Sequence, residues 1–152
     1  METIPLPNAR RDTLSSSRMS FNTVGAVIAG LITWISIATV LNLALRASWP
    51  HYHEAETSFN FTFAMKLVRL ALGAAACLSA GFIATWVGKE PMRAATLTGI
   101  ILLCLFIPGH YRIWDKFPVW YHLTFLMSLL PVTLFGAVLK ARDLPKSASP
   151  GF

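Results

Sequence analysis

The sequence predicts an all-α, polytopic membrane protein with four transmembrane helices in an antiparallel bundle and both termini in the cytoplasm. Three observations lead to this fold class. The 152-residue chain is 55% hydrophobic and only 13% charged, and its mean hydropathy of +0.56 is far above that of a soluble domain. Its apolar residues gather in four runs that can each cross about 30 Å of hydrocarbon. Lysines and arginines cluster at the ends of these runs.

The four runs set the predicted domain organisation. We expect a disordered basic tail at residues 1–20, a four-span membrane domain at 21–142 and a flexible tail at 143–152. The spans are predicted at about residues 21–45, 59–87, 92–110 and 118–140. The first run is too long for the hydrophobic region of a signal peptide, and it ends at Leu45-Arg46 without a small-x-small cleavage site. We therefore expect it to stay attached as the first span.

Small residues indicate how the spans pack. Overlapping small-xxx-small pairs near the start of the first span, from Gly25 to Gly30, would let a neighbouring helix approach closely. The second span has the smallest side chains in the chain, including Gly73 and Gly81, and is expected to be the central packing helix. Its predicted N-cap is Thr57 or Ser58, at the end of the first loop.

Prolines mark the turns of the later helices. Pro91 suits the first turn of the third helix, which is expected to end at Pro108-Gly109. Pro131 is a predicted kink in the fourth. Between these helices, residues 107–123 combine proline, tryptophan, tyrosine and histidine, a composition typical of a membrane-water interface.

The distribution of lysine and arginine predicts the orientation. One side of the bundle carries eight of them and the other carries five, most of which sit at helix ends where they can snorkel. We therefore place both termini inside, which puts all four histidines on the outer side. The eight are Arg10, Arg11, Arg18, Lys89, Arg93, Lys140, Arg142 and Lys146, and the five are Arg46, Lys66, Arg69, Arg112 and Lys116.

An outer polar layer is the first candidate site. Asn42, Arg69 and His122 are expected at similar depth, and His110 and Asp115 are assigned to the same layer. Because a charge at this depth is costly unless paired, Arg69 is expected to point inward. Its predicted partners are Asn42, carbonyls near Pro108, or a carboxylate of Glu54, Glu56 or Asp115. The alternative is simple snorkelling into headgroups.

The outer histidines and carboxylates form a second, weaker candidate. A zinc or copper site would need three or four of these ligands to converge on one ion. Haem ligation by His110 and His122 is a further alternative, and interfacial residues without any ligand are another. The candidate metal ligands are His51, His53, Glu54, Glu56, His110 and His122.

The absence of several sequence motifs narrows the range of possible functions. Asp and Glu are absent from the four apolar runs, and so are a Gly-rich phosphate loop, a Gly-x-Ser-x-Gly elbow and a His-Glu-x-x-His motif. No basic-aromatic surface for nucleic acid is visible. Cys77 and Cys104 lie in apolar runs at similar depth on antiparallel neighbours, which allows them to face each other, and they are predicted to be free thiols.

We therefore expect a non-enzymatic structural, assembly or partner-binding protein, with no cofactor predicted. Its expected partners are the lipid bilayer and another membrane protein bound through small-residue helix faces. Two alternatives remain open. One is a small transporter or lipid-binding protein, and the other is a metal, quinone or haem redox component.

The later spans also carry a family resemblance. The pattern Phe-Pro-x-Trp-Tyr-His-Leu at 117–123, Leu-Pro at 130–131 and Gly-Ala-x-Leu at 136–139 resembles the last span of small bacterial four-helix integral membrane proteins, most of them uncharacterised. Ala-Gly-Phe-x-Ala at 80–84 fits them too, so the likeness covers roughly residues 59–142. It implies the fold and a bacterial inner membrane, and it brings no activity. The first span and the His-x-His loop lie outside it.

Overall fold

The computed structural model of the protein describes residues 21–143. The tails predicted at 1–20 and 143–152 lie outside these residues, except for Asp143, which is the last residue of a helix. All regular structure from 21 to 143 is helical. The elements are α1 (Phe21–Ser48), α2 (Tyr52–Ser58), α3 (Phe63–Val87), α4 (Pro91–Arg112), the short 3-10 helix η2 (Trp114–Lys116) and α5 (Val119–Asp143).

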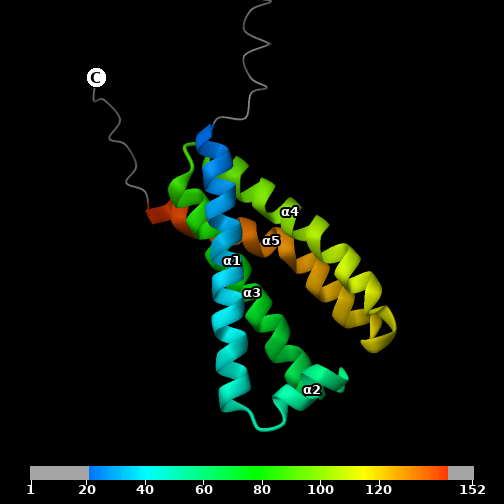
Figure 1. Cartoon of the computed structure of the whole chain (residues 1–152). Coiled ribbons are helices and arrows are strands. Elements are labelled where there is room, and N and C mark those ends of the chain that lie inside the picture. Colours follow the sequence, from blue (N-terminus) through cyan, green and yellow to red (C-terminus); the bar gives the residue numbers. More distant parts are fainter. Residues whose placement is uncertain (1–20, 144–152) are drawn as a thin grey trace, which may run out of the picture.

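Four of these helices are long and apolar enough to cross a membrane. They are α1, α3, the Met92–Arg112 part of α4 and the Val119–Arg142 part of α5. Successive long helices run in opposite directions, so the two described chain ends lie at the same end of the bundle (Figure 1). The predicted fold class, a multi-pass helical membrane protein built as a four-helix bundle, is confirmed.

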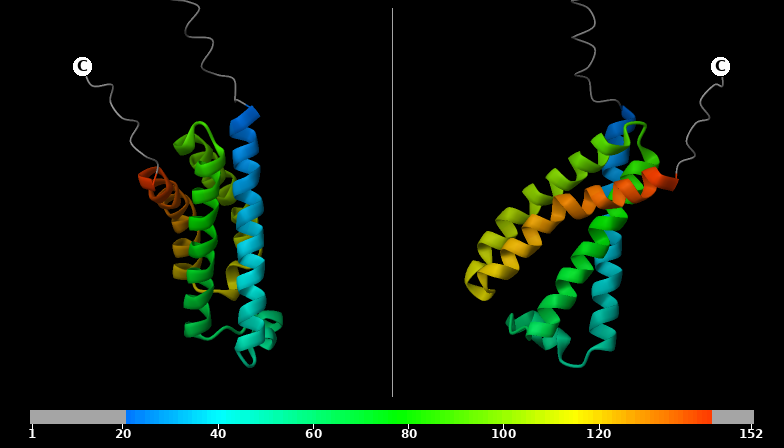
Figure 2. Two further views of the ribbon diagram at one scale, coloured as in Figure 1. Left: turned by 90° about the vertical axis from the view of Figure 1, so that its left-hand side faces the viewer. Right: turned by 180° about the vertical axis from the view of Figure 1, so that it is seen from behind.

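Helix α3 is the centre of the bundle, as its small residues predict. It packs against α1, α4 and α5. Figure 2 shows α1 and α3 side by side as one pair and α4 and α5 as a second pair that leans away from the first. The two pairs meet near the described chain ends and diverge toward the other end, where α2 and η2 lie. We call this second end the α2 end.

Glycines allow the two pairs to meet. A Cβ atom at Gly81 of α3 would overlap the backbone carbonyl of Thr133 on α5, and one at Gly136 of α5 would overlap the carbonyl of Leu78. On α1, a Cβ at Gly30 would lie 3.1 Å from atoms of both α3 and α4. The backbones are therefore in direct contact, which no larger side chain would permit. We call this region the crossing.

The start of α3 differs from the prediction. Thr62, rather than Thr57 or Ser58, caps this helix, and its hydroxyl oxygen accepts a hydrogen bond from the backbone N of Met65 at 3.3 Å. Thr57 and Ser58 instead close the separate helix α2. The chain breaks between the two helices because Phe59 has a left-handed φ of 58° and Phe61 turns into the core, where it is 7% exposed.

The prolines agree only in part with their predicted positions in the helices. Pro91 opens α4 after the short turn that begins at Gly88, as predicted. The expected end of this helix at Pro108-Gly109 is wrong, because α4 continues to Arg112 with Pro108 inside it. The missing N–H of Pro108 costs one backbone hydrogen bond, and the added turn brings His110 into the core at 6% exposure. Pro131 lies inside α5, and its kink stays a prediction.

Candidate functional site

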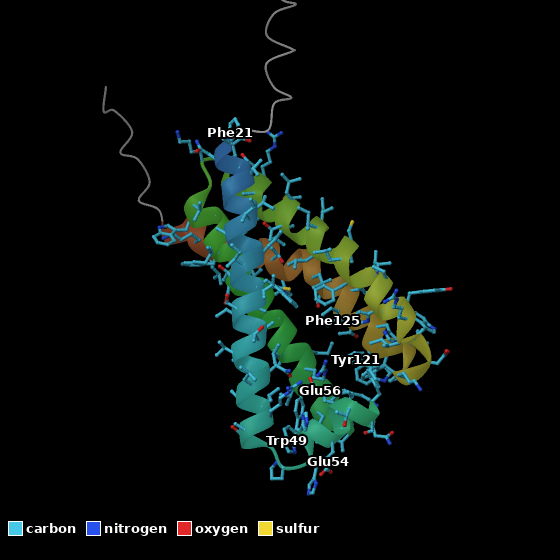
Figure 3. All side chains as sticks on the ribbon, in the orientation of Figure 1. Phe21, Trp49, Glu54, Glu56, Tyr121 and Phe125 are labelled. Atoms are coloured by element: carbon cyan, nitrogen blue, oxygen red, sulfur yellow. The ribbon has the colours of Figure 1, made fainter. Side chains whose placement is uncertain are left out.

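The short helix α2 covers the α2 end and carries the central carboxylate. Tyr52 and Ala55 are buried, and Glu56 follows them on the same helix face, since residues three and four apart are neighbours. The Tyr52 ring is fully buried, with its centroid 6.0 Å from that of Phe61. Figure 3 shows Glu56 turned toward the interior, with Tyr121 and Phe125 of α5 on the facing side. This anchoring aims Glu56 at α1 and α3.

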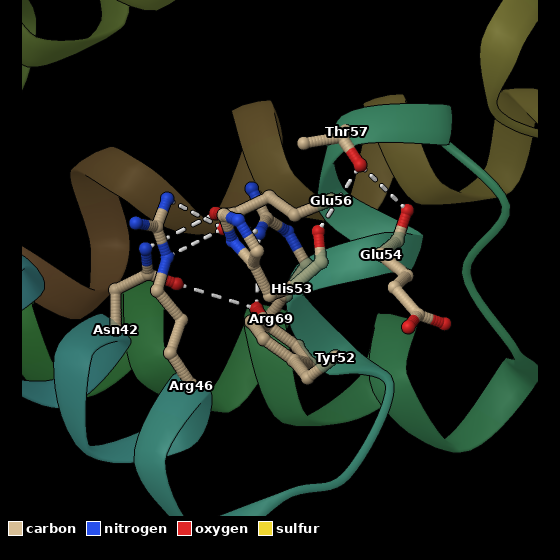
Figure 4. A network of polar contacts seen from close by, with 8 residues as sticks. All are labelled: Asn42, Arg46, Tyr52, His53, Glu54, Glu56, Thr57 and Arg69. Carbon is tan, nitrogen blue, oxygen red and sulfur yellow. Dashed lines mark hydrogen bonds and ion pairs between the residues drawn. The ribbon is translucent and has the colours of Figure 1, made fainter.

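Glu56 collects donors from both of these helices (Figure 4). Its Oε2 accepts from Nε of Arg46 at 2.7 Å and lies 2.6 Å from Nη2 of the same residue. Its Oε1 accepts from Nδ2 of Asn42 at 3.1 Å and from Nη1 of Arg69 at 3.4 Å. The hydroxyl of Tyr52 joins them by donating to Oδ1 of Asn42 at 3.3 Å. We call Asn42, Arg46, Tyr52, Glu56 and Arg69 the Glu56 cluster.

Arg69 is the most enclosed cation of this cluster. Its Nη1 also donates to the Tyr52 hydroxyl at 3.0 Å, and its guanidinium carbon lies 4.7 Å from the centroid of the Phe61 ring. Tyr121 interacts with the guanidinium from α5. The Nε atom is buried and has no hydrogen-bond partner among the residues described. The expected pairing of Arg69 with a loop carboxylate is confirmed, and Glu56 is the partner.

The positive charges of the cluster keep the Glu56 carboxyl group ionised. Partial burial would by itself raise the pKa of the Glu56 carboxyl, but hydrogen bonds from Asn42 and Arg46 and the charges of the two arginines outweigh it. The pKa therefore lies below its ordinary value, and the carboxylate is ionised at neutral pH. Two guanidiniums and one carboxylate leave a net charge of +1, from +2 and −1.

His110 and His122 form a second polar pair. Their Nδ1 atoms lie 2.8 Å apart, and Nε2 of His122 is 3.3 Å from the carbonyl oxygen of Trp114. A carbonyl only accepts, so this contact places a proton on Nε2 of His122, and the two Nδ1 atoms share one hydrogen bond. The His122 ring stacks on Trp114 and the His110 ring stacks on Phe125, each with 4.6 Å between ring centroids. Both histidines thus have fixed orientations inside the bundle.

The other predicted ligands do not join this pair. His51 contacts Glu54 at 3.1 Å on the exposed side of α2, while Glu56 is engaged by arginines. Within residues 21–143, no three His, Cys, Asp or Glu side chains are close enough together to hold a metal ion. The direct hydrogen bond between His110 and His122 also differs from the haem alternative, in which the iron would separate the two imidazoles. His53 and Asp115 are exposed and lie outside the Glu56 cluster.

A cavity of about 370 Å³ lies beside the Glu56 cluster, between α1, α3, α4 and α5. One end is polar, with Asn42, Arg46 and Arg69. The rest is largely apolar and aromatic, and its lining includes Trp34, Leu43, Leu72, Phe106 and Phe125. We call it the main cavity because it borders the Glu56 cluster, and it occupies the space where the two helix pairs diverge.

A smaller cavity of about 240 Å³ adjoins the main cavity. It shares Arg69, Phe106, Tyr121 and Phe125 with the main cavity, and its lining also includes Glu56 and His110. Arg69 therefore lines both cavities.

The two cysteines occupy different environments. Cys77 is 1% exposed and its sulfur accepts from Nε1 of Trp34 at 3.3 Å, while Cys104 lies on the exposed surface of α4. Both are free thiols, as predicted.

Sequence reasoning missed part of this site. Arg46, Tyr52, Trp34 and Tyr121 were not among the predicted site residues. A signal for Tyr52 does exist, because Tyr52, Ala55 and Glu56 lie on one face of any helix formed by the first loop.

These features describe a four-span helical membrane protein with an ion-pair cluster and an apolar cavity at one end. Comparison with protein-family models, with curated proteins and with solved structures finds no match for the chain. The resemblance to small bacterial four-helix membrane proteins therefore stays a sequence-based expectation.

Proposed function

We propose that this chain is a non-enzymatic, lipid-binding protein of the bacterial inner membrane. The observation that carries the proposal is the main cavity, which combines a long apolar lining with a polar end. Its volume of about 370 Å³ falls in the range of roughly 300–1,000 Å³ found for small-molecule sites. That volume suits most of one acyl chain, with the rest of the lipid outside the cavity.

The rim of the main cavity supports a lipid as the occupant. Thr39 and Leu43 of α1 line it and are exposed, and most of the neighbouring exposed residues of α1 are apolar, such as Ile35 and Val40, with Ser36 as the polar exception. In a bilayer this surface of α1 faces lipid. A lipid can therefore enter the main cavity sideways from the surrounding leaflet, without crossing water.

The other proposed roles have less support in the contacts. A structural or partner-binding role through small-residue faces would need those faces to be free, yet Ala26, Gly30 and Gly81 pack against the chain's own helices. In that α1 stretch, Gly25 borders open space and Ala29 is half-buried. The redox role rested on converging histidines, and the described ones form a pair and an exposed contact instead.

The orientation belongs to the same proposal. We place the described chain ends in the cytoplasm and the α2 end on the outer side, from the eight-to-five distribution of lysine and arginine. A reporter fused after Phe152 is expected to report cytoplasm, and one inserted near Tyr52 the outer side. An external carboxyl end would reverse the assignment.

Lipid binding is tested by native mass spectrometry of the protein released from lipid nanodiscs. The wild type is expected to keep one tightly bound lipid. Ala38→Phe fills the main cavity from α1 and should lose it, whereas Ala64→Phe, on the exposed surface of α3, should keep it. Equal lipid retention by both variants would contradict the proposal, and a second polypeptide that stays bound instead would favour partner binding.

A further inference from the structure

We infer that the main cavity selects a phospholipid of net negative charge, whose headgroup is held by Arg46 and Arg69. This inference rests on the proposed lipid binding and adds the chemistry of the headgroup. Three features of the Glu56 cluster carry it: the balance of charge, the unused donors and the direction of the cavity.

The charge balance favours an anion. The main cavity is lined by Arg46 and Arg69 and by no Asp or Glu. Both arginines share the carboxylate of Glu56, which leaves one positive charge uncompensated in the cluster. An unpaired charge close to the hydrocarbon is costly, so a ligand with one negative charge stabilises the site.

Some N–H groups of the two guanidiniums make no hydrogen bond within the described residues. Arginine has five N–H donors. In Arg46, the Nε and Nη2 groups contact the carboxylate of Glu56. Within the described residues its Nη1 donates no hydrogen bond, and its side chain is 41% exposed. The Arg69 side chain is 30% exposed, and because its partnerless Nε is itself buried, the exposed end of the guanidinium is the part that a ligand can reach. A phosphate diester offers several acceptor oxygens and matches the planar fork of these groups.

The shape of the main cavity sets the orientation of the lipid. Arg46 is in the last turn of α1, and Trp34 is twelve residues earlier in the same helix. At 1.5 Å per residue these positions are about 18 Å apart along the axis. A headgroup at Arg46 would thus sit at the α2 end, with its chain directed past Leu43 toward Trp34 and the bilayer centre.

The test compares two lipids with identical chains. The protein is placed in nanodiscs of equal parts phosphatidylglycerol, which is anionic, and phosphatidylcholine, which is neutral overall, and the retained lipid is identified by native mass spectrometry. The wild type is expected to prefer the anionic lipid about tenfold, the effect of one charge-assisted contact. Arg46→Gln should bring the ratio close to one, while Arg46→Lys should keep part of the preference.

Lys66→Gln is the matched control, since it removes a cation at the α2 end that does not line the main cavity. It should leave the preference unchanged. A wild type that retains lipid without any preference would overturn the inference and leave lipid binding intact. Loss of the preference in Lys66→Gln as well would also overturn it, by showing that general surface charge selects the lipid.

Two further outcomes separate the remaining sources of failure. Retention of no lipid by the wild type would contradict the proposed function itself. Displacement of the bound lipid by inorganic phosphate would show that the arginines form a site for the free anion, and the lipid assignment would then be wrong. If Arg46→Gln does not fold, the ratio measured for the wild type and for Arg46→Lys decides the question.

Discussion

The crossing and the α2 end use opposite kinds of packing. At the crossing, Gly81 and Gly136 let α3 and α5 touch backbone to backbone, and the buried polar groups there are hydroxyls such as Thr133, which bonds within its own helix. At the α2 end the same helices are farther apart, and the space holds aromatic rings, two arginines, a carboxylate and two cavities.

The difference shows how one bundle can be stable and still keep a site. Close contact of small residues needs no ligand and leaves no room for one. Once the helices diverge, only large side chains and polar partners can fill the gap, and Arg69 is supported there by Tyr52, Glu56 and Phe61. The close backbone contacts and the proposed lipid site thus lie toward opposite ends of α3.

The largest loss of stability is expected when a methyl group is added at the crossing. Gly81→Ala places a Cβ against the Thr133 carbonyl, where no flexible atom can yield. The free energy of unfolding should fall by roughly 3 kcal/mol, or the fold should be lost, as for severe overpacking. Gly109→Ala, which meets nothing within 4 Å, is the control for thermal unfolding in detergent. Equal effects of the two would contradict direct backbone contact.

A smaller effect is expected from breaking the Glu56 cluster. Arg69→Ala leaves Glu56 and the Tyr52 hydroxyl short of a donor, so it should cost about 2 kcal/mol of unfolding free energy. Lys66→Ala should cost far less, because its side chain makes no ion pair in the described structure. Chemical or thermal unfolding of both variants in the same detergent provides the measurement. If both substitutions cost the same, Arg69 serves only as a snorkelling anchor.

The acid sensitivity of the α2 end gives a finer comparison. Because the pKa of Glu56 is lowered by folding, its contribution to stability is present above the ordinary carboxyl pKa and is lost as the pH falls through the folded value. Glu56→Gln should reduce the loss of stability on acidification, measured as the unfolding midpoint over a pH series. An unchanged pH profile would show that other carboxyls dominate.

The smallest expected effect concerns the two thiols. A lipid-soluble maleimide should modify Cys104, which is exposed, well before Cys77, which is buried beside Trp34. Peptide mass spectrometry after timed labelling identifies the modified residue. Rapid labelling of Cys77 in the folded protein would contradict the close packing of this residue beside Trp34.

Part of the Glu56 cluster could be predicted from the sequence, because the depth of a residue in the bilayer follows from its distance to the end of a span. Asn42 and Arg69 were expected at one level of the bilayer from their distance to the span ends, and a loop carboxylate was an expected partner. The choice of Glu56 over Glu54 was not predictable, since it depends on the seven-residue helix α2 and on which of its faces Tyr52 buries. Asp115 was placed in the same layer and lies on η2, outside the cluster.

The sequence by itself determined the four spans, the turn at Pro91 and the central place of α3, because these depend on the length of apolar runs and on residue size along one chain segment. Only the tertiary structure decided where Arg46 and Tyr52 act, how His110 and His122 pair, and where the cavities lie. The physical reason is that the glycine contacts at the crossing set how far the two helix pairs diverge at the α2 end, and no local pattern encodes that distance.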